Sequence, residues 1–99
     1  MTTDVNLAKQ AIHDKLESQI KTAEATLYTL KARAETAKAN GELKAIAELL
    51  SRKQAVLQKL HELKKSDGGQ WERAKADLET RVAEFEKSVK GIDSRVKNT

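Results

Sequence analysis

Apolar residues follow a seven-residue repeat through the last third of the chain. They stand at alternating steps of four and three, the spacing of a helix that packs along one side against a partner. The repeat is carried by Trp71, Leu78, Val82, Phe85, Val89, Ile92 and Val96. It predicts a coiled-coil helix over about residues 71–97.

Two further apolar patterns precede this helix. The first 41 residues carry a thin seam in which many members are alanine, and residues 43–63 carry a broader stripe that can face two neighbours. Both patterns predict helix, and each apolar face must be covered by a neighbouring helix. Over the whole chain, the predicted interaction seam comprises Leu16, Ile20, Leu27, Leu30, Ile46, Leu50, Leu57, Leu60, Trp71, Leu78, Val82, Phe85, Val89 and Ile92.

The clearest boundary between predicted helices lies at residues 66–70. Basic residues precede it, as favoured at a helix C-terminus, and Gly68 and Gly69 can adopt the left-handed conformation that ends a helix. The pattern predicts a tight turn here between two antiparallel helices.

A second interruption, Asn40-Gly41, leaves two architectures open. Both residues are poor inside a helix, and the apolar stripe changes face at this point. The sequence slightly favours an all-α antiparallel coiled-coil hairpin, with a long first helix over about residues 4–65 that is kinked or broken near 40–41. Its N-terminal seam would then need a second molecule to cover it. The alternative is a three-helix bundle. Either way, residues 1–99 are predicted to form a single helical domain.

Composition and charge narrow the possible functions. The chain has no Cys and no Pro, 34% of its residues are charged, and only three are aromatic. Disulfides, thiolate nucleophiles and Cys-based metal sites are therefore excluded. No apolar run approaches the roughly 18 residues of a membrane span, which predicts a soluble, cytoplasmic protein. The net charge is +4. The surplus is concentrated in residues 41–65 and diluted there by acids, which disfavours nucleic-acid binding.

Few residues of this chain could bind a metal ion or take part in catalysis. His13, Asp14 and Glu17 share a helical face, but no second cluster supplies further metal ligands, so His13 is interpreted as an exposed surface residue. Tyr28 is predicted to pack its ring beside the seam. Trp71 is predicted to cap one end of the bundle. No catalytic, cofactor or metal site and no small-molecule substrate are predicted, so the protein is expected not to be an enzyme.

The segment 64–79 resembles small bacterial coiled-coil proteins rich in Lys, Ala and Glu, some of which are labelled stress-response proteins. That group carries a Gly-Gly-x-x-Trp turn followed by an amphipathic helix, whereas Gly68-Gly69-Gln70-Trp71 places the Trp one residue closer. The interruption at Asn40-Gly41 departs from the group's unbroken first helix. The resemblance implies a helical fold and an association with stress, and it implies no site residues.

Two hypotheses about function follow. The first is a non-enzymatic coiled-coil structural or interaction protein that self-associates as a homo-oligomer or binds another helical protein through an uncovered seam. The second is reversible binding of an amphipathic helix to an anionic membrane surface. The polar faces carry nearly as many acids as bases and bulky apolar residues are sparse, both of which weigh against a membrane surface.

Overall fold

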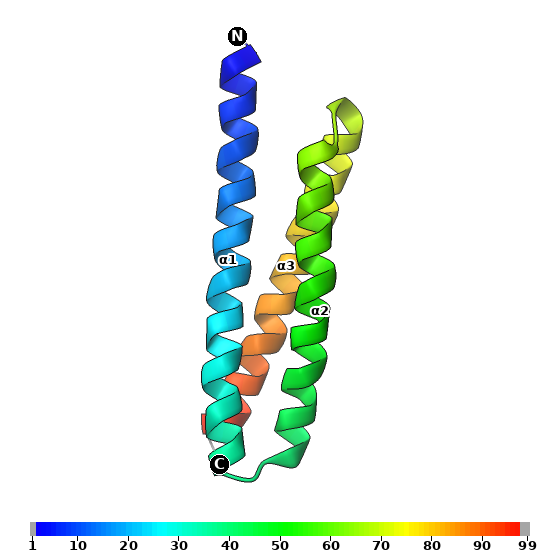
Figure 1. Ribbon diagram of the computed structural model, residues 1–99. Helices are drawn as coiled ribbons and strands as arrows, with labels where there is room; N and C mark the ends of the chain where they lie inside the picture. Colours follow the sequence, from blue (N-terminus) through cyan, green and yellow to red (C-terminus); the bar gives the residue numbers. More distant parts are fainter. Residues whose placement is uncertain (1, 98–99) are drawn as a thin grey trace.

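Three α-helices make up the part of the chain that the structure describes. This computed structural model describes the backbone of residues 2–97 and the side chains of residues 7–97. Helix α1 covers Thr2–Thr36, α2 covers Asn40–Lys65 and α3 covers Gly68–Lys97. Helix α2 runs antiparallel to both α1 and α3, and every pair of helices is in contact (Figure 1). The result is a rod with extents of 55 × 18 × 15 Å. The predictions of an all-α fold and, as its alternative form, a three-helix bundle are confirmed.

The chain reverses direction between α1 and α2, so the favoured single helix over residues 4–65 is not what forms. Lys38 lies in the left-handed region with a φ of 57°. Its N–H donates to the carbonyl of Glu35 at 3.2 Å, and the N–H of Ala39 donates to the carbonyl of Ala34 at 2.9 Å. These two bonds form a Schellman motif, in which a left-handed residue ends the helix and satisfies its last carbonyls. Ala39 also packs against the core cluster that contains Ala34, the apolar contact that usually accompanies this motif.

The break therefore lies earlier than the Asn-Gly signal predicts. Asn40 and Gly41 are the first two residues of α2, and the left-handed residue is Lys38. The left-handed conformation costs a residue with a Cβ atom about 1–2 kcal/mol. A lysine therefore does not predict a helix end at its own position. Ala34 is buried and Ala39 is partly buried at this end of the core, and their packing offsets that cost.

The second reversal matches the predicted boundary but is shorter. Helix α2 ends at Lys65, and only Ser66 and Asp67 separate it from α3. The N–H of Ser66 donates to the carbonyl of Leu63 at 3.2 Å. Gly68 has a φ of 56°, the conformation for which a glycine is favoured. Helix α3 begins there, three residues before the predicted start at Trp71.

The core consists of two apolar clusters arranged along the rod. One lies towards the α1–α2 turn and the other towards the α2–α3 turn. The buried members of the first are Ala23, Leu27, Leu30, Ala34, Ile46, Leu49, Phe85, Val89, Ile92 and Val96. Those of the second are Leu16, Ile20, Val56, Leu60, Leu63, Trp71, Leu78 and Val82. All three helices contribute to both clusters, so the apolar faces cover one another within a single chain.

Candidate interaction surfaces

The predicted interaction seam lies inside the bundle. Leu50 and Leu57 are half-buried at the edges of the two clusters. All the other members are buried in the core, namely Leu16, Ile20, Leu27, Leu30, Ile46, Leu60, Trp71, Leu78, Val82, Phe85, Val89 and Ile92. These side chains pack against other helices of the same chain and expose little surface to a second molecule.

The inner face of α2 differs from the predicted one. Its buried positions follow a regular alternation of three and four residues, and they are Ile46, Leu49, Lys53, Val56, Leu60 and Leu63. The sequence predicts Ile46 and Leu60 on this face correctly, but it also predicts Leu50 and Leu57, which lie at the edges of the clusters. The alternation is visible in the sequence, but a lysine occupies its third position and conceals it.

Lys53 is buried because it has a charged partner on α1. Its side chain is 8% exposed, and its ammonium forms an ion pair and hydrogen bond with the carboxylate of Glu24, whose side chain is 30% exposed. Along α2, Lys53 lies between Leu49 of the first cluster and Val56 of the second. The pair is therefore a polar layer between the two apolar clusters, and it ties α1 to α2 at one register.

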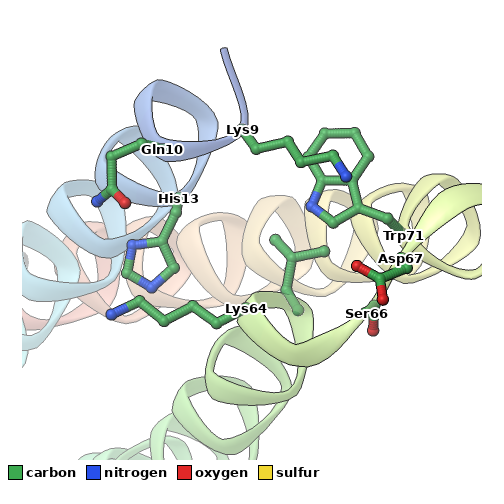
Figure 2. A pocket seen from close by; sticks show the side chains of 8 residues that line it. Lys9, Gln10, His13, Lys64, Ser66, Asp67 and Trp71 are labelled. Atoms are coloured by element: carbon green, nitrogen blue, oxygen red, sulfur yellow. The ribbon is translucent and has the colours of Figure 1, made fainter. Parts of the chain in front are cut away.

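A cleft of about 270 Å³ lies at the end of the bundle that carries the α2–α3 turn. Figure 2 shows the side chain of Lys9 reaching over Trp71, with Lys64 below the ring of His13. The ammonium groups of Lys9 and Lys75 lie 5.1 and 5.7 Å from the centre of the Trp71 ring. The contact of Lys9 joins the N-terminal part of α1 to α3, whereas Lys75 lies one turn from Trp71 on α3 itself. Trp71 is buried at this end of the rod, where the heptad pattern predicts it.

His13 lines this cleft and is 7% exposed, so its interpretation as an exposed surface residue is wrong. Its Nδ1 lies 3.4 Å from a carboxylate oxygen of Asp14. The stripe position of His13, three residues before Leu16, could have predicted its burial. Among the residues whose side chains are described, no group of three or more His, Cys, Asp and Glu side chains is arranged to hold a metal ion.

The outward face of α1 carries the exposed apolar side chains. Leu7 is 62% exposed and Tyr28 is 52% exposed, and these are the exposed large hydrophobic residues of the described part of the chain. The prediction that the Tyr28 ring packs beside the seam is wrong. Tyr28 follows Leu27, which points into the core, and the adjacent helical position turns it towards solvent.

Comparisons of the chain with protein-family models, with curated proteins and with solved structures find no match. Between residues 2 and 97, the structure has no helix that is long and apolar enough to cross a membrane.

Proposed function

We propose that this protein is a non-enzymatic helical interaction protein that self-associates through the outward face of α1. The observation that carries this proposal is the exposure of Leu7 and Tyr28 on one helix, because the other large apolar side chains of residues 7–97 are buried or partly buried. The two residues stand three heptads apart, about 32 Å along the helix axis. They would give a helical partner two widely spaced apolar contacts.

The residues between these two contacts favour a helical partner. Ala11, Ser18 and Ala25 lie on the outward face and are small and exposed. Small side chains let a second helix approach towards the near end of the usual interaxial distance of about 8–10 Å. Tyr and Leu at the two ends would then pack against the partner and lose water from their surfaces.

A membrane surface fits this face less well. Amphipathic membrane helices immerse a wide, bulky apolar face in lipid. The bulky apolar residues of α1 such as Leu16, Ile20 and Leu27 are in the core, and release to lipid would require the bundle to open. On the outward face, the charged side chains of Asp14 and Lys21 lie between Leu7 and Tyr28 and are 62% and 69% exposed.

Light scattering coupled to size exclusion, over a wide concentration range, tests the proposal. We expect the mass to rise from 11.0 kDa to twice that value as concentration increases. The variants Leu7→Glu and Tyr28→Glu should shift this transition to higher concentration, because each places a charge in the interface. Ala47→Glu, at an exposed position on α2, is the matched control and should leave the transition unchanged. A chain that remains monomeric up to about 1 mM would refute self-association.

A further inference from the structure

We infer that the partner is a second copy of this chain whose α1 lies antiparallel to the first, about a two-fold axis between Glu17 and Ser18. The inference rests on the proposed self-association and specifies its geometry. It starts from four residues at seven-residue intervals on α1, which are Leu7, Asp14, Lys21 and Tyr28. All four side chains are exposed, so this row runs along one edge of the outward face for most of the helix.

The row becomes self-complementary when two copies of α1 run in opposite directions. With the axis between residues 17 and 18, a residue of one copy faces the residue of the second copy for which the two residue numbers add up to 35. Leu7 then faces Tyr28 of the second copy, and Asp14 faces Lys21 of the second copy. Two-fold symmetry makes each contact twice, as in any isologous dimer. One axis thus aligns both the apolar pair and the charged pair.

A parallel arrangement in the same register does not have this property. It would place Asp14 against Asp14 and Lys21 against Lys21, and like charges across an interface are unfavourable. Charged residues at flanking positions are what set partner orientation in coiled coils. The order of charges along α1 therefore favours the antiparallel dimer.

Asp14 and Lys21 make contacts within their own chain, and these contacts compete only weakly with the proposed ion pairs between two copies. An oxygen of Asp14 accepts a hydrogen bond from Gln10 at 2.8 Å, and the ammonium of Lys21 lies 3.5 Å from Glu17. These two contacts link neighbouring turns of α1 on its solvent side. The same Asp14 oxygen also lies 3.4 Å from Nδ1 of His13, a longer contact than the one with Gln10. Exposed pairs of this kind contribute little, so the side chains are available to a second molecule.

Charge reversal tests the pairing. Asp14→Lys would face Lys21 of the second copy, and Lys21→Asp would face Asp14. The dimerisation affinity of each single variant should therefore fall by about tenfold or more. The double variant Asp14→Lys/Lys21→Asp restores opposite charges and should regain the affinity of the natural chain. Asp77→Lys is the matched control, because it makes the same charge change on α3, and it should have no effect. Single variants that dimerise normally, or a double variant that does not recover, would overturn the antiparallel register.

Cysteine cross-linking tests the same register without changing charge, because the natural chain has no Cys. A Leu7→Cys chain mixed with a size-tagged Tyr28→Cys chain should cross-link efficiently with a short bismaleimide. Two Leu7→Cys chains should not, since residue 7 of one copy would lie about 32 Å along the axis from residue 7 of the other.

The outcomes separate this inference from the proposed function. Efficient cross-linking between two Leu7→Cys chains would mean a parallel dimer, which overturns the register and leaves self-association intact. A monomer in light scattering overturns both. Cross-linking of only the mixed pair, with rescue by the double charge reversal, supports both.

Discussion

Replacing Glu24 and replacing Lys53, the two partners of the buried ion pair, should change the free energy of unfolding by different amounts. In Glu24→Gln the Lys53 ammonium stays buried without a counter-charge. Breaking a fully buried pair in this way costs about 3–5 kcal/mol, and because the Glu24 side chain is 30% exposed we expect a loss of about 2 kcal/mol here. In Lys53→Met an apolar chain of similar length fills the same space, and Glu24 can turn towards water. We expect this variant to stay within about 1 kcal/mol of the natural chain.

Chemical denaturation at one fixed protein concentration measures these effects, since association would otherwise shift the stability. Trp71 is the only tryptophan and is buried, so its fluorescence reports unfolding, with circular dichroism as a second probe. A loss of about 2 kcal/mol should lower Tm by roughly 10 °C in a domain of this size. The double variant Glu24→Gln/Lys53→Met should resemble Lys53→Met alone, because the unpaired charge is gone.

A matched control is the exposed pair of Glu62 and Lys59, whose charged atoms lie 3.6 Å apart on α2. Glu62→Gln should change stability by at most about 0.5 kcal/mol. The reasoning fails if Lys53→Met is as destabilising as Glu24→Gln, or if Glu24→Gln is as mild as Glu62→Gln. Either result would mean that burial of the ammonium is not what makes Glu24 necessary.

Further substitutions probe the turns and the core by denaturation. Lys38→Gly should stabilise the bundle by about 0.5–1 kcal/mol, because it relieves a left-handed residue, and a loss of stability would contradict the Schellman geometry. Gly68→Ala should cost about 1 kcal/mol at a φ of 56°, and an unchanged midpoint would contradict that backbone conformation. Gly91→Ala should instead stabilise α3 by up to about 1 kcal/mol, because the new Cβ meets only the tip of Arg95 at 3.8 Å; destabilisation would contradict the space seen there. Phe85→Ala should cost about 3–5 kcal/mol, since the ring is fully buried, and a cost below about 1 kcal/mol would contradict its place in the core.

The candidate interaction surface was only partly visible in the sequence. Its residues are those that do not pack in the core. Identifying them requires knowing which face of each helix packs against the other two. Leu7 belongs to no seam in the sequence, and Tyr28 stands beside one. The heptad row from Leu7 to Tyr28 becomes a candidate interaction surface only because the structure shows that it is exposed to solvent.

The sequence by itself determined the elements. A heptad repeat, abundant helix formers and the absence of proline specify long helices whatever surrounds them, because these are properties of neighbouring turns of one helix. The buried residues of α3 and the reversal after Lys65 followed from the same local rules. They depend on contacts within a few residues along the chain.

Only the tertiary structure decided how those helices meet. The break falls at Lys38, a residue with no turn preference, because packing of Ala39 against the core offsets the strain there. Lys53 occupies a core position because Glu24 on another helix compensates its charge. Periodicity defines an apolar face, but the neighbour that covers it is set by contacts between distant residues, and these exist only in the folded bundle.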